Sequence, residues 1–178
     1  MKKKPKRKGP KLVKIFPDSS WLISLLNKKD SNHDHIKSSF GFLTGQHATF
    51  FLSSLVILET MNGLTKNENG FTVRTAEKCI KSFFKKITLR TEKPIKLEKI
   101  LHKYHQFVKN RKIRSNTTVD FYIVTEGMVL GSHILTVDKK MYKLTKPTYK
   151  NIYLISEKVK GIKSDLPRFV ENIVNNSV

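Results

Sequence analysis

Four acidic residues lie in or beside apolar segments of a chain that has few acids. They are Asp18, Glu59, Asp120 and Asp138, from a total of 14 Asp and Glu in 178 residues. Carboxylates gathered in one place repel one another unless a cation lies among them. Oxygen ligands without a cysteine cluster or paired histidines favour hard cations, Mg²⁺ or Mn²⁺. These residue types therefore indicate a metal site at which water could be activated for hydrolysis.

Each of these acids also has an ordinary structural explanation. An aspartate directly after a strand, as at Asp18 or Asp138, is often a helix N-cap. Asp120 could favour a helix dipole, and Glu59 could pair with one of the many lysines. The metal hypothesis therefore depends on the four acids meeting at one place in the fold.

The elements that must position these acids alternate along the chain. Strands are expected at 12–16, 49–52, 87–89, 133–137 and 151–156. Helices are expected near 21–26, 35–40 (helix or loop), 54–63, 72–86, 91–109, 116–130 and 164–174. Short apolar strands that alternate with helices predict an α/β layered domain with a mainly parallel sheet.

In such a sheet, the carboxyl ends of the strands and the first turns of the following helices share one edge, where ligands bind. Asp18 and Asp138 directly follow expected strands, and Asp120 lies in a first helical turn. Glu59 lies about a turn and a half into its helix. The topology therefore predicts that all four carboxylates face the same edge.

Two helices show amphipathic patterns whose apolar faces should point inward. For the helix at 91–109, the expected inward residues are Leu97, Ile100, Leu101, Tyr104, Phe107 and Val108. For the last helix they are Phe169, Val170, Ile173 and Val174. The polar stretch at 33–35 is expected to be an exposed loop.

Positive charge dominates the chain, with 35 Lys and Arg and a net charge of +21. Eight of these charges lie in residues 1–14, which leaves 13 on residues 15–178. We expect a disordered basic arm at 1–11 and a single domain at 12–178. A body this basic favours a nucleic-acid partner, although a ribosome-associated passenger or a lysine-rich proteome would give the same balance.

Several protein classes are excluded by other features. No apolar run approaches the roughly 20 residues that span a bilayer, and no apolar segment behind the first basic residues suggests a secretory signal. The single cysteine, Cys79, allows neither a disulfide framework nor a multi-cysteine zinc site. We expect a cytoplasmic protein that does not contact membranes.

The segment from Lys78 to Arg114 holds 13 basic residues and two acids. It could form an RNA-binding face or the solvated face of amphipathic helices. The candidate RNA-binding residues are Lys96, Lys99, Lys103, Arg111, Lys112 and Arg114.

Three motifs resemble those of one known nuclease family. The segment Ile15–Ile23 resembles the opening strand, aspartate and serine motif of PIN-domain nucleases. Ser53–Glu59 resembles their second motif, a serine that leads to a helical glutamate. Asn116–Asp120, followed by Gly131–Asp138, resembles the family's third block, with a step of 18 positions from the first aspartate to the second. The size of the chain is similar to that of VapC-like toxins, which are single-domain ribonucleases held inactive by an antitoxin.

This resemblance implies a Rossmann-like three-layer domain that hydrolyses RNA with Mg²⁺ or Mn²⁺. The four acids would then hold the metal, while Ser20 and Thr136 would steady the site. A homodimer and a cognate antitoxin protein are also implied.

The chain departs from the family pattern after Asp138. Many relatives have another acid and a phenylalanine there, whereas this chain has Lys139, Lys140 and Met141. Two other functions therefore stay open: a catalytically silent RNA-binding module of an RNA-processing or ribosome-associated assembly, and a DNA- or structure-specific nuclease.

Overall fold

A computed structural model describes residues 13–89, 97–108, 118–156 and 163–177. Within these residues, five strands form one sheet in which all pairs are parallel. The strands are β1 (Lys14–Pro17), β2 (Thr49–Phe50), β3 (Thr88–Leu89), β4 (His133–Thr136) and β5 (Ile152–Leu154). The predicted α/β class with a parallel sheet is confirmed. The basic arm predicted at 1–11 lies outside the described residues.

The strand order is β3-β2-β1-β4-β5, so the chain builds the sheet outward in two directions from β1. Consecutive strands extend it from β1 through β2 to β3, and the chain then returns to add β4 on the other side of β1. In the register, Pro17 at the end of β1 lies beside Leu135 of β4. The order therefore reverses between β1 and β4, and this is the position where open parallel sheets bind ligands.

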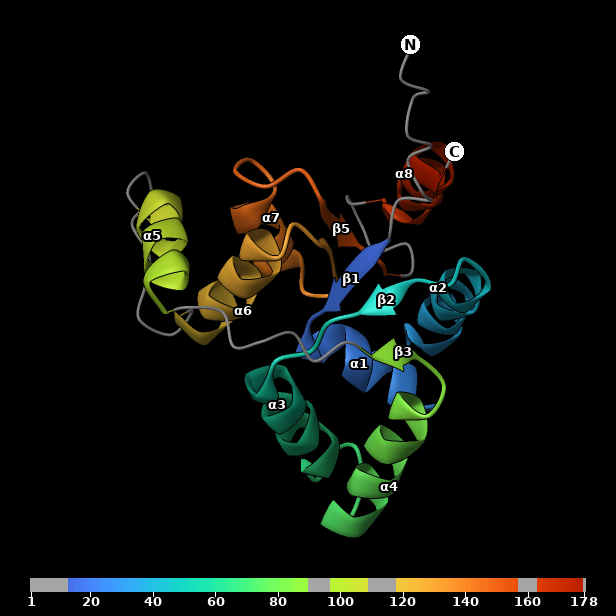
Figure 1. Cartoon of the computed structure of the whole chain (residues 1–178). Coiled ribbons are helices and arrows are strands. Elements are labelled where there is room, and N and C mark those ends of the chain that lie inside the picture. Colours follow the sequence, from blue (N-terminus) through green and yellow to red (C-terminus); the bar gives the residue numbers. More distant parts are fainter. Residues whose placement is uncertain (1–12, 90–96, 109–117, 157–162, 178) are drawn as a thin grey trace, which may run out of the picture.

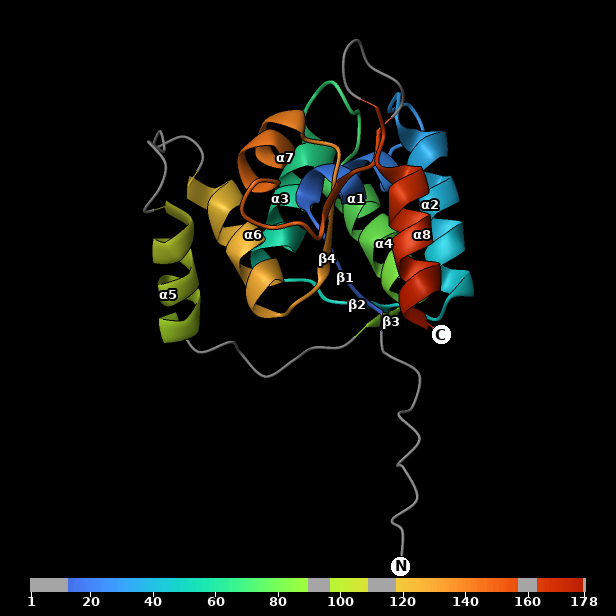
Figure 2. The same cartoon turned by 90° about the horizontal axis from the view of Figure 1, so that it is seen from above.

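Eight helices connect the strands in the described part of the chain (Figure 1). They are α1 (Ser19–Leu26), α2 (His33–Gly45), α3 (Ser54–Thr65), α4 (Val73–Phe84), α5 (Leu97–Val108), α6 (Thr118–Val129), α7 (Lys139–Thr145) and α8 (Leu166–Ser177). Seen from above, α6 and α7 lie on one side of the sheet, and α2 and α8 lie on the other (Figure 2). This layering is the three-layer Rossmann-like arrangement that was predicted.

Side-chain caps set the starts of four helices. The capping residues are Asp18, Ser53, Thr72 and Asp138. Each accepts a hydrogen bond from a backbone N–H three positions further on, which satisfies a donor that the first helical turn leaves without a partner. Two candidate metal ligands are therefore also helix caps: Asp18 begins α1 after β1, and Asp138 begins α7 after β4.

Aromatic side chains fill much of the core. Ring centroids of Trp21, Phe40, Phe50 and Phe83 lie 5.7–6.5 Å apart and join α1, α2, β2 and α4. Such pairs stabilise the fold beyond the burial of their area. On the other side, Gly127 lets α6 approach the sheet closely, since a Cβ there would lie 2.8 Å from Ile134 of β4. This close approach helps to place the first turn of α6, which carries Asp120.

Several local predictions were wrong. The polar stretch at 33–35 begins α2 instead of forming a loop, and α7 was not predicted. Two residues expected to face inward are exposed: Leu101 of α5 is 52% exposed and Val174 of α8 is 44% exposed. In α8 the buried apolar residues are Phe169 and Ile173, and among the described side chains of α5 Ile100 is buried and Tyr104 is partly buried. The first residues of the helix expected at 91–109 lie outside the described residues, and α5 begins at Leu97.

Candidate active site

The site begins where the strand order reverses. Asp18 follows β1 and Asp138 comes two residues after the end of β4, at the carboxyl edge of the sheet. The backbone N–H of Asp18 donates to the carbonyl oxygen of Leu135 at 2.9 Å, so the β1–β4 pairing continues up to this aspartate. Parallel pairing of two central strands therefore brings together carboxylates that lie 120 positions apart in the sequence.

Asp18 is buried, with 4% of its surface exposed, and three groups donate to its carboxylate. The backbone N–H of Trp21 lies 2.8 Å from Oδ1, and the Thr136 hydroxyl lies 2.6 Å from Oδ2. The Ser20 hydroxyl lies 2.9 Å from both oxygens. Burial nevertheless raises the pKa of Asp18 to about 7, and the nearby charge of Asp138 adds to the rise against the three donors.

The same two hydroxyls connect Asp18 to the backbone that leads to Asp138. Thr136 Oγ1 accepts from the N–H of Asp138 at 2.9 Å, and Ser20 Oγ accepts from the N–H of Val137 at 3.2 Å. A carboxylate, two hydroxyls and two backbone amides therefore form one network between the strand ends. Ser20 and Thr136 fix the orientation of the Asp18 carboxylate and the path of the chain after β4.

Glu59 and Asp120 reach the same edge from α3 and α6. The Ser19 hydroxyl donates to Oε2 of Glu59 at 3.0 Å, which ties the glutamate to the first residue of α1. The pKa of Asp120 is raised, first by burial and then by the charges of Asp138 and Glu59. The charges of Asp138 and Glu59 therefore act on Asp120, and the charge of Asp138 also acts on Asp18.

The donor set of this site fits a hard divalent cation. Every candidate ligand is a carboxylate oxygen. Burial raises the pKa of Asp18 and of Asp120, and the charges of neighbouring acids add to the rise, which a bound cation would oppose. In the parts of the chain that the structure describes, no three acidic, histidine or cysteine side chains lie close enough together to hold a metal ion. The assignment of Asp18, Glu59, Asp120 and Asp138 as metal ligands stays a prediction.

Two residues near this edge were not among the predicted site residues. Ser19 holds Glu59, and its place directly after Asp18 was the signal that could have identified it. Lys140, in the first turn of α7, lowers the pKa of Asp120. Glu126 of α6 is partly buried, and burial raises its pKa while the Ser53 hydroxyl lowers it.

The predicted RNA-binding residues fall mostly outside the described part of the chain. Lys96, Arg111, Lys112 and Arg114 are in this group. Lys99 and Lys103 lie on α5, where Lys99 is exposed and Lys103 is partly buried. Because α5 packs against α6, the helix that carries Asp120, these two lysines stand on an element joined to the acidic site.

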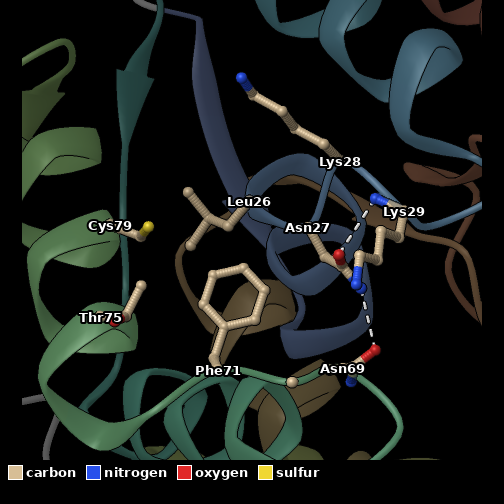
Figure 3. A pocket seen from close by; sticks show the side chains of 9 residues that line it. Leu26, Asn27, Lys28, Lys29, Asn69, Phe71, Thr75 and Cys79 are labelled. Carbon is tan, nitrogen blue, oxygen red and sulfur yellow. Dashed lines mark hydrogen bonds between the residues drawn. The ribbon is translucent and has the colours of Figure 1, made fainter.

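A pocket of about 320 Å³ lies at the opposite end of α1 (Figure 3). The Phe71 ring points toward Leu26, and Thr75 and Cys79 face them from α4. No acidic residue lines this pocket. The carboxylate cluster and the pocket are therefore separate features at the two ends of one helix.

The fold is a Rossmann-like α/β domain in which acidic side chains lie at the topological switch point of the sheet. Residues 15–147 match the family model of the PIN domain, and the chain belongs to this family. PIN domains are generally nucleases, usually metal-dependent, and they act on nucleic acids. No curated protein matches the chain. None of the helices in its described residues is long and apolar enough to cross a membrane.

Proposed function

We propose that this chain is a cytoplasmic endoribonuclease that depends on Mg²⁺ or Mn²⁺. The observation that carries the proposal is the buried Asp18 carboxylate, held by three donors at the switch point of the sheet beside Asp138. A fold gains no stability from a buried carboxylate that its neighbours repel. The placement is explained by a reaction in which negative oxygens must converge on a cation.

The residues of the proposed site have two roles: four acids would bind the cation, and three hydroxyl groups orient the acids. Asp18, Glu59, Asp120 and Asp138 would hold the divalent cation. When bound, such a cation supplies a water of lowered pKa and stabilises the charge that develops on the phosphate. Ser20 and Thr136 keep both oxygens of Asp18 oriented, and Ser19 does the same for Glu59.

The choice of RNA as substrate rests on the resemblance to VapC-like toxins together with the net charge of +21. Lys99 and Lys103 of α5, with the four basic residues outside the described ranges, would contact RNA phosphates. On the same resemblance, we propose a toxin that forms a homodimer and is held inactive by a cognate antitoxin.

The proposal is tested by incubating a pool of structured and single-stranded RNAs with the protein in Mn²⁺, Mg²⁺ or EDTA. Asp18→Asn should reduce cleavage by at least about a thousandfold, because the amide carries no charge for the cation. Asp34→Asn is the matched control, since Asp34 is an exposed aspartate at the start of α2. It should cut as fast as the wild type.

Three outcomes would contradict parts of the proposal. Cleavage that persists in EDTA or in Asp18→Asn would exclude the metal site. RNA binding without cleavage in either metal would favour the catalytically silent module. Faster cleavage of single-stranded DNA than of RNA with the same sequence would favour the DNA nuclease.

A further inference from the structure

A groove lies between the end of α1 and the helices α2 and α4. It consists of the pocket shown in Figure 3 and a second cavity of about 440 Å³. The two cavities adjoin, because Leu26, Lys28 and Cys79 line both. Much of the groove wall is apolar. The apolar lining residues are Leu25, Leu26, Phe40, Phe71 and Phe83.

Four lysines line the same groove, which we call the lysine groove. They are Lys28, Lys29, Lys37 and Lys86, and all four are exposed. Among the residues that the structure describes, no acid lines either cavity. Within the described ranges, none of the four ammonium groups forms a hydrogen bond or an ion pair. The groove therefore combines an apolar wall with positive charge that the protein does not neutralise, which is complementary to an anionic partner.

Two aromatic side chains distinguish among the anionic partners that could fill this groove. Phe71 and Phe40 are both partly exposed, and the Phe71 ring extends into the first cavity toward Leu26 (Figure 3). Single-stranded nucleic acid binds to grooves of this kind, because its phosphates contact the cations while its bases stack on aromatic rings. A duplex presents phosphates but keeps its base faces inside the stack. The groove therefore fits a single strand better than a duplex.

We propose that the lysine groove is a second RNA-binding site, in which unpaired bases stack on Phe71 and Phe40 while the lysines contact phosphates. The groove lies at the Asn27 end of α1, roughly 13 Å along the helix axis from Asp18. It would hold a part of the strand that flanks the cleaved phosphate. This inference deepens the proposed nuclease function and rests on it for the cleavage measurement, whereas the binding measurements do not require cleavage.

The first experiment removes two charges from the groove and two from elsewhere. Lys37→Gln with Lys86→Gln is the groove variant, and Lys66→Gln with Lys78→Gln is the control, since these two lysines are exposed but line neither cavity. Binding of a fluorescein-labelled single-stranded RNA is measured in EDTA over a range of salt concentrations. The groove variant should weaken binding about tenfold or more and lower the log–log salt slope by about 1.4, the value for two phosphate contacts to a single strand. The control should stay within about threefold of the wild type.

Cleavage of the same RNA in Mn²⁺ separates this groove from the acidic site. A contact remote from the reacting phosphate is made equally in the ground state and in the transition state. The groove variant should therefore raise KM by about the factor by which it weakens binding, and its kcat should stay within about twofold of the wild type.

The second experiment removes an aromatic face. Phe71→Leu keeps an apolar side chain but removes the flat ring, so binding of the single strand should weaken about fivefold or more. Phe71→Tyr retains the ring and should bind like the wild type. Thermal unfolding of both variants verifies that they are folded at the temperature of the binding measurement.

The third experiment uses Cys79, the single cysteine of the chain, as a reporter. Its side chain is partly exposed and lines both cavities. Saturating single-stranded RNA should slow its alkylation by iodoacetamide several-fold in the wild-type protein. High salt should restore the rate, because it displaces the RNA.

Two results would overturn the inference. Equal losses of binding in the two lysine variants would show a diffuse charge effect, and an unchanged alkylation rate with bound RNA would show that the strand lies elsewhere. Groove variants that bind RNA like the wild type would leave the groove to another partner, such as an acidic protein segment, and would also contradict it. If the wild type binds RNA but never cuts it, the proposed function fails, and the binding and alkylation measurements still decide whether the groove holds RNA.

Discussion

The two ends of α1 carry capping residues that are buried to the same extent but differ in charge. Asp18 precedes the helix and Asn27 follows it, and each has 4% of its surface exposed. They lie nine positions apart, which is roughly 13 Å along the helix axis. Both side chains have hydrogen-bond partners, yet one end holds a carboxylate beside other acids and the other holds a neutral amide beside a pocket.

At the Asn27 end, the polar groups satisfy one another. Its Oδ1 accepts from the N–H of Lys29 at 3.1 Å, and its Nδ2 donates to Oδ1 of Asn69 at 2.9 Å. Asn69 in turn donates to the carbonyl oxygen of Gly63 at 2.7 Å, which joins the end of α1 to α3. A buried amide with such partners costs little, because no net charge leaves water.

At the Asp18 end, three donors do not compensate for the loss of water. Burial raises the pKa of Asp18 to about 7 in spite of them, and Asp138 raises it further. The two caps of α1 therefore differ in energetic cost: the buried amide of Asn27 is compensated by its hydrogen bonds, and the buried carboxylate of Asp18 is not. Asp18 therefore reduces the stability of the fold near neutral pH, whereas Asn27 contributes to it.

The strongest test of this comparison is the effect of Asp18→Asn on stability at different pH values. The unfolded chain releases the Asp18 proton near its ordinary pKa of 3.8, whereas the folded chain keeps this proton up to about pH 7. The free energy of unfolding of the wild type should therefore fall as the pH rises through this range. The asparagine of Asp18→Asn does not titrate, so the variant does not lose stability in this range. At pH 8 it should be more stable than the wild type by on the order of a few kcal/mol.

Urea unfolding in EDTA at pH 4.5, 6 and 8 measures the difference between the two proteins. This difference in the free energy of unfolding should shrink as the pH falls, because the Asp18 carboxyl of the wild type becomes protonated. Asp34→Asn provides the control and should show no such trend, since Asp34 is exposed. A variant that is less stable than the wild type at pH 8 would show that the three donors outweigh burial.

A smaller effect is expected for Thr136→Val, which changes the network without changing its charge. The Asp18 carboxylate loses its closest donor, and the N–H of Asp138 loses its acceptor. Stability should fall by about 1–3 kcal/mol, and cleavage should fall by about tenfold because Asp18 is less well oriented.

Thr145→Val is a matched control for this experiment. Thr145 is also fully buried, but its hydroxyl has no hydrogen-bond partner among the described residues. The substitution should leave cleavage unchanged and stability equal or slightly higher. If both valine variants lose activity to the same degree, the hydroxyl of Thr136 has no special role at the site.

Most of the fold could be predicted from the sequence because its signals are local. Short apolar runs and the capping residues Asp18 and Ser53 lie within a few positions of the elements that they define. Helix α7 escaped prediction because three of its seven residues are lysines, and its apolar contact comes from Met141 packed in the core. The exposure of Leu101 and Val174 depends on how widely each helix is covered, which periodicity does not report.

The candidate site could be predicted only in outline. The edge shared by Asp18 and Asp138 follows from parallel pairing, which the alternation of elements already indicated. The Ser19–Glu59 hydrogen bond and the effect of Lys140 on Asp120 depend on how α3 and α7 approach α1 and α6. These approaches are set by core packing between distant segments, and no local pattern encodes them.

The smallest effect should come from Asn69→Ala, at the neutral end of α1. The substitution removes the acceptor for Asn27 and the donor to the carbonyl of Gly63, so the amide of Asn27 loses its partner in a buried position. Stability should fall by about 1–2 kcal/mol by thermal or urea unfolding. Cleavage should stay at the wild-type rate, because this end of the helix has no charged contact with the acids.

Asn67→Ala is the control for this last variant, since Asn67 is exposed two residues earlier in the same turn. It should leave both stability and cleavage unchanged. Loss of cleavage in Asn69→Ala at a temperature where the variant is fully folded would mean that the two ends of α1 are coupled. In that case the Asn27 cap would help to set the position of Asp18 as well as the stability of the helix, and the division between the two ends would not hold.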